Sequence, residues 1–118
     1  MTDIIAEVVH GRTIGRALGF PTANRSLEGY TEIERGVYRS SVEIDGTRYR
    51  AMSNVGVRPS VGGKELLLET HVIGFSGDLY GRKLCVTLEE KLRDEKRFSS
   101  ISDLKEQLQR DYVICAER

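Results

Sequence analysis

The chain has 118 residues, a length that supports one hydrophobic core but is short for two. Lysine plus arginine and aspartate plus glutamate number 18 each, so no net charge attracts the molecule to nucleic acid or to an anionic membrane. No segment approaches the roughly 20 apolar residues of a membrane-spanning helix, and acidic Asp3 stands where a secretion signal carries positive charge. We therefore expect one cytoplasmic, monomeric domain over residues 1–118, with no nucleic-acid or membrane partner.

Most of the chain has the pattern of short β-strands. β-rich or alternating residues predict strands over 4–9, 36–44, 47–55, 66–73 and 83–92. Asp45-Gly46 joins the second strand to the third as a two-residue hairpin turn, which needs positive φ at both positions. The first strand of this hairpin is expected to carry Tyr38, Ser40, Val42 and Ile44 on one face, and the return strand Tyr49, Ala51, Ser53 and Val55 on one face.

Near the C-terminus the period changes to that of an amphipathic helix. Ser100 caps its first turn, with Asp103 three residues later, and the apolar stripe consists of Ile101, Leu104, Leu108, Tyr112 and Cys115. Antiparallel strands followed by one helix indicate a mainly β fold. A small closed barrel is favoured because closure removes exposed strand edges, and an open sheet with a helix on one face is the alternative.

The two cysteines, Cys85 and Cys115, lack the spacing of a metal site. Both occupy apolar-looking positions, so we expect buried free thiols in a reducing compartment.

A glycine-spaced segment follows the first strand. Glycine lets backbone amides approach an anion, and arginine offers planar donors to phosphate oxygens; the segment carries Gly11, Arg12, Gly15, Arg16 and Gly19. The spacing fits neither the Walker-A loop nor the Gly-x-Gly-x-x-Gly loop of dinucleotide sites. A phosphate site is one interpretation, and a flexible surface loop with solvated arginines is the other.

Directly after the glycines, Pro21 stiffens the chain before two neutral oxygen-bearing side chains, Thr22 and Asn24. In an extended chain these two side chains point the same way. Mg²⁺ accepts such oxygens while it binds nucleotide phosphates. The alternative is that both side chains satisfy backbone groups at a turn.

Seven short motifs occur in the order found in the riboflavin kinase (flavokinase) family. They are Val-Val-His-Gly at 8–11, Gly-Phe-Pro-Thr-Ala-Asn at 19–24, Gly-Val-Tyr at 36–38, Ser-Asn-Val-Gly-Val-Arg-Pro at 53–59, Glu-Thr-His at 69–71, Asp-Leu-Tyr-Gly at 78–81 and Leu-Arg-Asp-Glu-Lys-Arg-Phe at 92–98. The chain resembles the kinase half of bifunctional bacterial FAD synthetases over nearly its whole length. The resemblance implies a six-stranded antiparallel Greek-key β-barrel with one C-terminal α-helix. It also implies Mg²⁺- and ATP-dependent phosphorylation of riboflavin at its ribityl 5′-hydroxyl, giving FMN. The adenylyltransferase half is missing, so no FAD synthesis is expected.

The same resemblance implies a role for particular residues. Thr22 and Asn24 correspond to metal ligands, and Glu69 to the catalytic base. The nucleotide-binding positions are Gly11, Arg16, Val72, Gly74 and Tyr80, and the flavin-binding positions are Arg93, Lys96 and Phe98. Gly74 replaces an acidic residue of many members, which leaves nucleotide preference open, and Ser60 replaces a threonine.

Two of these assignments have a physical argument and an alternative. Glu69 shares its strand face with Leu67, His71 and Ile73, and apolar neighbours would raise its pKa and favour a base; a solvent-facing strand glutamate is the alternative. Phe98 can pack on the isoalloxazine ring with Arg93 and Lys96 as cationic donors. The 92–98 segment can instead be a charged connection whose Phe98 anchors the helix.

Two other functions are compatible with a small barrel. One is a flavin-binding barrel without catalytic activity. The other is a module for single-stranded nucleic acid with a basic stripe of Arg39, Arg48 and Arg50, against which zero net charge and few aromatic residues argue.

Overall fold

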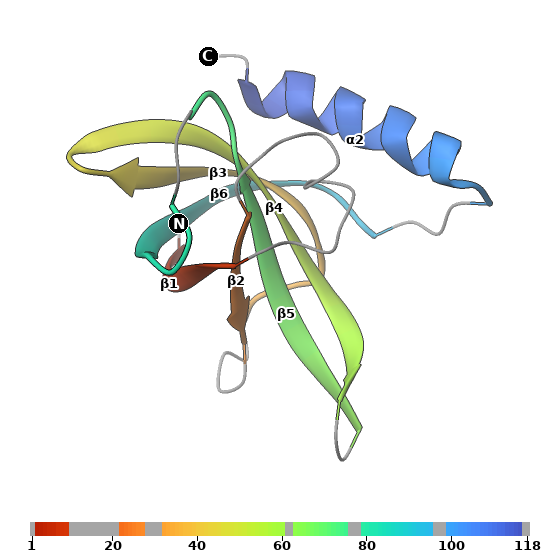
Figure 1. Cartoon of the computed structure of the whole chain (residues 1–118). Helices are drawn as coiled ribbons and strands as arrows, with labels where there is room; N and C mark the ends of the chain where they lie inside the picture. The colour runs from red at the N-terminus through yellow and green to blue at the C-terminus, as the bar shows by residue number, and fades with distance from the viewer. Residues whose placement is uncertain are drawn as a thin grey trace.

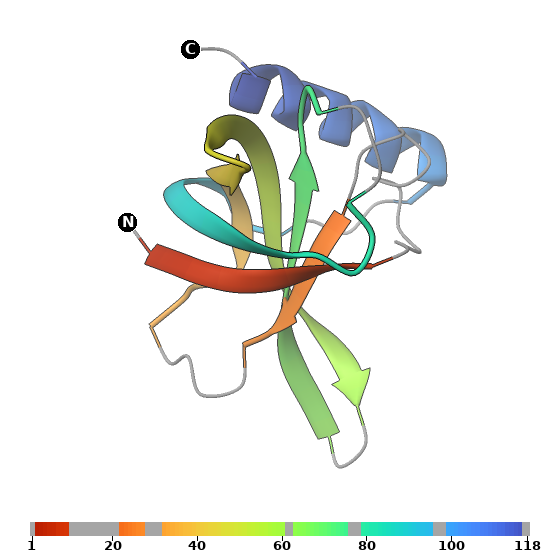
Figure 2. The ribbon, with the colours of Figure 1, turned by 60° about the vertical axis from the view of Figure 1, so that its left-hand side comes forward.

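The computed structural model describes residues 2–9, 22–27, 32–60, 63–75, 79–95 and 99–116. Its strands are β1 (Thr2–Val9), β2 (Thr22–Ser26), β3 (Gly36–Ile44), β4 (Thr47–Ser60), β5 (Gly63–Val72) and β6 (Lys83–Arg93), and its helix is α2 (Ile101–Ala116). The six strands close into a barrel in the order β1-β2-β5-β4-β3-β6, with every pair antiparallel. Figures 1 and 2 show the strands wrapped around one interior, with α2 outside it.

The strand order confirms the closed barrel over the open sheet. β3, β4 and β5 pair in sequence as two hairpins. The last of them, β5, also pairs with β2, which precedes β3 in the chain, and this connectivity is a Greek key. At the β3–β4 turn, Asp45 has φ 50° and Gly46 has φ 84°, so both positions adopt the predicted left-handed conformation. β4 and β5 are longer than predicted, and in Figure 1 their hairpin extends beyond the rest of the barrel.

Alternate residues of the strands fill the barrel interior, which agrees with the alternation predicted for β3, β4 and β6. Val42, Ile44, Ala51 and Val55 are buried there, with Tyr38 and Tyr49 packed against them. Three buried hydroxyl groups cross this apolar interior as a hydrogen-bonded chain. The distance between oxygens is 2.7 Å from Ser40 to Ser53 and 2.8 Å from Ser53 to Thr70. Polar groups inside the core therefore satisfy one another.

α2 packs on the outer surface of β3 and β4, crossing the strands in Figure 1. Between α2 and the barrel lies a second apolar cluster, to which the helix contributes Cys115 and Tyr112. Its other members are Val37, Met52, Ile73 and Leu92. The predicted cap is confirmed, because the Asp103 amide donates to Ser100 Oγ at 3.1 Å. Within the described residues, no helix has the length and apolar composition needed to cross a bilayer.

The two thiols differ in environment. Cys115, on the face of α2 that packs against the barrel, is fully buried, as predicted, and burial raises its pKa to about 12. Cys85 is only half-buried, which corrects the expectation that both thiols are buried. Its neighbours Leu84 and Val86 point into the core, so the pleat directs Cys85 to the outer face of the barrel.

Candidate functional site

A row of polar residues crosses the outer face of three adjacent strands. Glu69 on β5 lies directly opposite Asn24 on β2 and Asn54 on β4. Their neighbours in sequence, Ala23 and Leu68 among them, point into the core, so the row faces outward. Cβ atoms of directly opposite residues are about 4.5–5.5 Å apart. The barrel therefore brings together two residues that the sequence assigned to metal binding and to proton transfer.

Asn24 has a polar atom with an unusual environment. Its side-chain oxygen Oδ1 is buried and accepts no hydrogen bond from the part of the chain that the structure describes. Such an orphaned oxygen beside a carboxylate is costly unless a ligand satisfies it, and an amide oxygen is a ligand that Mg²⁺ accepts. The residue thus fits a cation site. Thr22 lies opposite His71 in the next row, but its side chain is outside the described atoms.

Glu69 is an outward-facing residue that is nevertheless mostly covered, with 14% of its side chain exposed. This placement disagrees with a freely solvated strand glutamate. His71, two residues later on the same face, is 5% exposed, and its Nε2 lies 3.6 Å from Glu69 Oε1. Burial lowers the pKa of His71 to about 4, so the imidazole is neutral near pH 7.

The predicted nucleotide positions that are described gather at one end of the barrel. Val72 ends β5 with its side chain in the core, so only its backbone is available to a ligand. Gly74 follows with φ 81°, and Tyr80 is 58% exposed in the turn before β6. That turn is bound to β1, because the Gly81 amide donates to the Val8 carbonyl at 2.9 Å. β2 also begins at this end, with Thr22 opposite Val9. Gly11 and Arg16 lie outside the described residues.

On the flavin side, only Arg93 is described, and Lys96 and Phe98 are not. Arg93 belongs to the same cross-strand row as Glu69, through Asn54 and Val37. Three strand spacings separate Arg93 from Glu69, which is roughly 14 Å along the sheet. The Arg93 guanidinium is directed to Asp111 of α2, at 2.7 Å from Nη2 to Oδ2. The structure therefore places Arg93 beside the helix and away from the Asn24–Glu69 pair.

Two residues near this row were not singled out from sequence. Asn54 lies opposite Glu69, and Glu95 reaches over Gly56, where an added Cβ would come within 2.6 Å of Glu95 Oε2. Asn54 was predictable in principle. In a hairpin with Ser60 opposite Gly63, the register of the two strands puts Asn54 opposite Glu69. No local signal indicates the position of Glu95.

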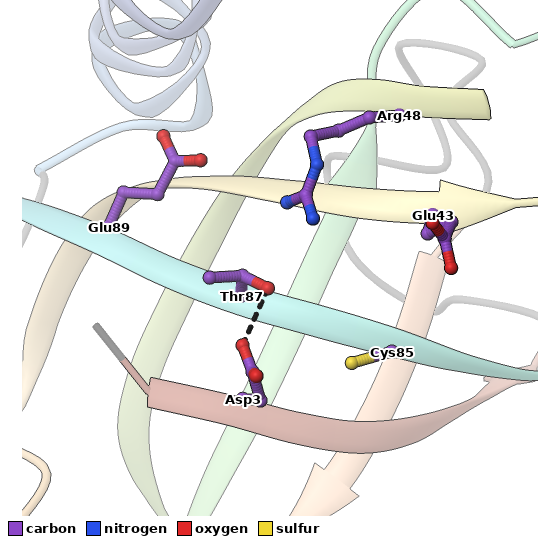
Figure 3. A pocket seen from close by; sticks show the side chains of 6 residues that line it. All are labelled: Asp3, Glu43, Arg48, Cys85, Thr87 and Glu89. Carbon is purple, nitrogen blue, oxygen red and sulfur yellow. Dashed lines mark hydrogen bonds between the residues drawn. The ribbon is translucent and has the colours of Figure 1, made fainter. Parts of the chain in front are cut away.

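A different pocket, of about 620 Å³, lies on the outer face centred on β6, across the barrel from β5. Figure 3 shows its lining by Asp3, Glu43, Arg48, Cys85, Thr87 and Glu89. Thr87 donates to Asp3 at 2.7 Å. This face also carries the arginines of the suggested basic stripe. Arg50 pairs with Glu89 at 3.8 Å and Arg39 with Glu90 at 3.5 Å, so the arginines alternate with carboxylates and form no uniformly basic surface.

Comparison with known proteins gives a family match over almost the whole chain. The family model described as riboflavin kinase matches residues 2–117. The bifunctional riboflavin kinase/FMN adenylyltransferase of Pseudomonas fluorescens is 44% identical over 113 residues, covering 95% of this chain and 36% of that protein. Its counterpart in Escherichia coli K12 is 41% identical over 117 residues, covering 97% and 37%. The chain thus spans a little over a third of the length of these relatives.

Two further proteins are similar over the full chain. The RNA-binding riboflavin kinase of Bacillus subtilis is 36% identical over 119 residues, covering 100% of this chain and 51% of that protein. Among solved structures, one described as a macrolide-efflux protein from Streptococcus pneumoniae superposes with a TM-score of 0.82 at 34% identity. The match covers 98% of this chain and 38% of that one.

Proposed function

The chain belongs to the riboflavin kinase family, and from this premise we propose that it phosphorylates riboflavin to FMN with ATP in a magnesium-dependent reaction. The observation that carries the proposal is the pairing of Asn24 with Glu69 across β2 and β5. It sets a buried oxygen without a partner in the described chain next to a largely covered carboxylate. Phosphoryl transfer needs these two elements close together, because charge neutralisation and orientation of the nucleophile occur at one centre.

Glu69 has the role of general base in this proposal. The ribityl 5′-hydroxyl oxygen forms a bond to the γ-phosphorus of ATP, and the bond from that phosphorus to the β,γ-bridging oxygen breaks. The hydroxyl proton passes to the Glu69 carboxylate, and ADP leaves. The neutral form of His71 supports this role, since a protonated imidazole 3.6 Å away would weaken the carboxylate as a base.

Thr22 and Asn24 are the proposed ligands of the metal ion. When bound, Mg²⁺ supplies neutralisation of the charge on the nucleotide phosphates. The buried Oδ1 of Asn24 gains a partner on binding, which removes the cost of leaving it unsatisfied. We assign the phosphates to Gly11 and Arg16 and the rest of the nucleotide to the barrel end with Val72, Gly74 and Tyr80.

The flavin is assigned to the region that follows β6, with Lys96 and Phe98 as its contacts and Arg93 as part of the same wall. This places the two substrates on either side of the Asn24–Glu69 pair. The described nucleotide positions lie at the end of the barrel where β1 pairs with β2, and Arg93, the described flavin position, lies at the end of β6. Separate substrate sites that meet at one centre are what an in-line transfer requires.

The test is incubation of the purified chain with riboflavin, ATP and Mg²⁺, followed by chromatography for FMN. We expect FMN with Mg²⁺ and none with excess EDTA. Glu69→Gln should lower turnover by about 100- to 10,000-fold while the far-ultraviolet circular dichroism stays unchanged. Near-normal turnover of a folded Glu69→Gln variant would exclude Glu69 as the base. Riboflavin binding by the native chain without any FMN would identify a flavin-binding barrel instead of a kinase.

A further inference from the structure

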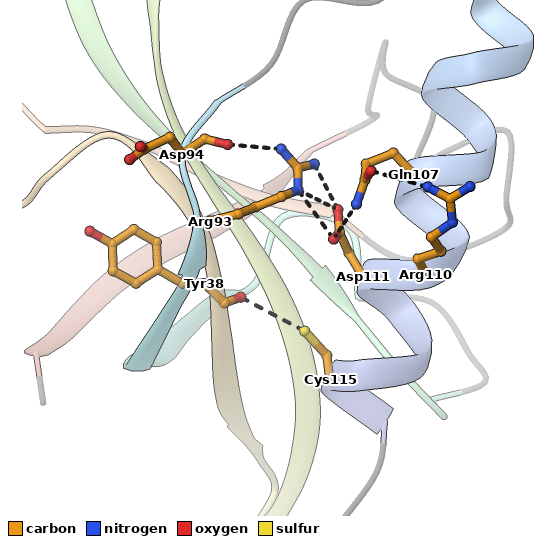
Figure 4. Close-up of polar contacts among 7 residues, drawn as sticks. All are labelled: Tyr38, Arg93, Asp94, Gln107, Arg110, Asp111 and Cys115. Carbon is orange, nitrogen blue, oxygen red and sulfur yellow. Dashed lines mark hydrogen bonds and ion pairs between the residues drawn. The ribbon is translucent and has the colours of Figure 1, made fainter.

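All three guanidinium nitrogens of Arg93 make polar contacts within the protein. Its Nε lies 3.2 Å from both carboxylate oxygens of Asp111, and Nη2 donates to Asp111 Oδ2 at 2.7 Å. Nη1 donates to the Asp94 carbonyl oxygen at 2.9 Å. Figure 4 shows the guanidinium between the end of β6 and α2, directed at both partners. The planar fork of arginine is suited to this two-sided contact, whereas the single ammonium of lysine is not.

Asp111 is a buried charge whose environment is built around Arg93. Only 2% of its side chain is exposed, and Gln107, one turn earlier in α2, donates a second hydrogen bond to Oδ1 at 3.1 Å. A buried carboxylate persists only when it is paired and hydrogen-bonded, so loss of Arg93 would leave an uncompensated charge under the helix. Because it is covered, Asp111 has no surface with which to contact a substrate.

The ion pair determines where the chain runs after β6. Arg93 holds the carbonyl of Asp94, and the Asp94 carboxylate pairs with Lys91 Nζ at 2.7 Å. Glu95 then turns over β4 at Gly56, where the lack of a side chain makes room for its carboxylate. Arg35 fixes that carboxylate from the other side at 2.7 Å. Residues 93–95 are thus fastened to α2, β6 and the segment before β3.

This fastened segment adjoins the row of Glu69. Gly56 lies two residues after Asn54 on the same face of β4, and Asn54 is directly opposite Glu69. Asn54 Nδ2 and Glu95 Oε2 both lie within 3.3 Å of the position a Gly56 Cβ would occupy. In contrast, the nucleotide end of the barrel is joined to β1, where the Gly81 amide donates to the Val8 carbonyl.

We propose that Arg93 and Asp111 are positioning residues that act together. They fix residues 94–95 against β4, beside the row of Glu69, and riboflavin binding depends on this placement. This rests on the proposed function, and it assigns Arg93 an indirect role in place of direct contact with the flavin. The ion pair therefore governs affinity for riboflavin and leaves affinity for Mg-ATP unaffected.

The experiment compares the native chain with Asp111→Asn and Arg93→Lys, using riboflavin fluorescence titration for binding and FMN formation for kinetics. Asp45→Asn is the matched control, because it breaks the two-point Arg82–Asp45 pair at the exposed β3–β4 turn. We expect both ion-pair variants to weaken riboflavin binding by about 10- to 100-fold, the range for a misplaced contact segment, with KM for Mg-ATP unchanged. The control should match the native chain in both.

A folded Asp111→Asn variant with native riboflavin affinity, combined with weak binding by Arg93→Lys, would mean that Arg93 contacts the flavin directly and would overturn the inference. Equal losses for riboflavin and Mg-ATP would reduce the pair to a general stabilising role and would also overturn it. If Asp111→Asn does not fold, Gln107→Leu takes its place, because it removes the second hydrogen bond to Asp111 and leaves Arg93 intact, and weaker riboflavin binding is again expected. A native chain that forms no FMN would instead refute the proposed function.

Discussion

Asn24 and Glu69 lie opposite each other on β2 and β5, on the outer face of the barrel. The amide oxygen of Asn24 is buried and lacks a hydrogen-bond donor within the described residues, and the Glu69 side chain is 14% exposed. The arrangement costs free energy of folding, because a buried oxygen that accepts no hydrogen bond has lost the bonds it makes with water. In the proposed function, a metal ion held by Thr22 and Asn24 would remove this cost.

Replacing Asn24 with leucine tests this cost directly. Leucine has nearly the same shape and no polar atom, so Asn24→Leu should raise the free energy of unfolding by about 1 kcal/mol. The same change should abolish Mg²⁺-dependent FMN formation. Urea denaturation in EDTA measures the first effect and chromatography the second. A drop in stability in the absence of metal would show that Oδ1 has a partner and would remove the main structural support for the cation site.

Ser53 occupies the middle of the hydroxyl chain inside the barrel, between Ser40 and Thr70. Ser53→Ala leaves both neighbouring hydroxyls without this partner in a fully buried environment. We expect a loss of about 1–3 kcal/mol in the free energy of unfolding, measured by urea denaturation. Ser102→Ala, at an exposed position of α2, is the control and should change stability by less than about 0.5 kcal/mol. Similar values for the two variants would mean that the chain of hydroxyls contributes little.

The stability of the protein should depend on the protonation of His71. Its pKa is lowered from 6.5 to about 4 by burial, so the unfolded chain takes up this proton at higher pH than the folded chain does. The contribution of neutral His71 is complete above pH 6.5 and is lost as pH falls toward 4. In that window the native chain should lose up to about 1.4 kcal/mol per pH unit more than His71→Gln does. Denaturation curves at several pH values provide the comparison, and parallel pH dependences would contradict it.

The two thiols should differ in reactivity. Burial raises the pKa of Cys115 to about 12, and its Sγ lies 3.9 Å from the Tyr38 carbonyl oxygen. At pH 8 only about one Cys115 in ten thousand is then a thiolate, the reactive form. Iodoacetamide should modify half-buried Cys85 first, and Cys115 only after unfolding. Peptide mass spectrometry distinguishes the two sites, and rapid labelling of Cys115 in the folded protein would show that α2 opens readily.

Local sequence patterns predicted much of the fold because each depends on neighbouring residues. The positive φ angles of Asp45 and Gly46, the Ser100 cap and the alternation that fills the barrel interior are all confirmed. The apolar pattern predicted burial wrongly where the burial of a side chain depends on which face of the barrel it occupies. Cys85 follows the apolar composition of its strand but lies on the half-covered outer face.

The candidate site shows the same division. The sequence alone identifies the 19–24 motif and Glu69 as candidate site residues, and their roles in metal binding and catalysis stay predictions. The sequence alone determined the strand pattern, the helix and the family resemblance, because these reside in residue type and short-range spacing. Only the tertiary structure decided that Asn24 meets Glu69 and that Arg93 is engaged by Asp111. Strand register and helix packing join residues that are distant in the chain, and no short-range pattern encodes such contacts.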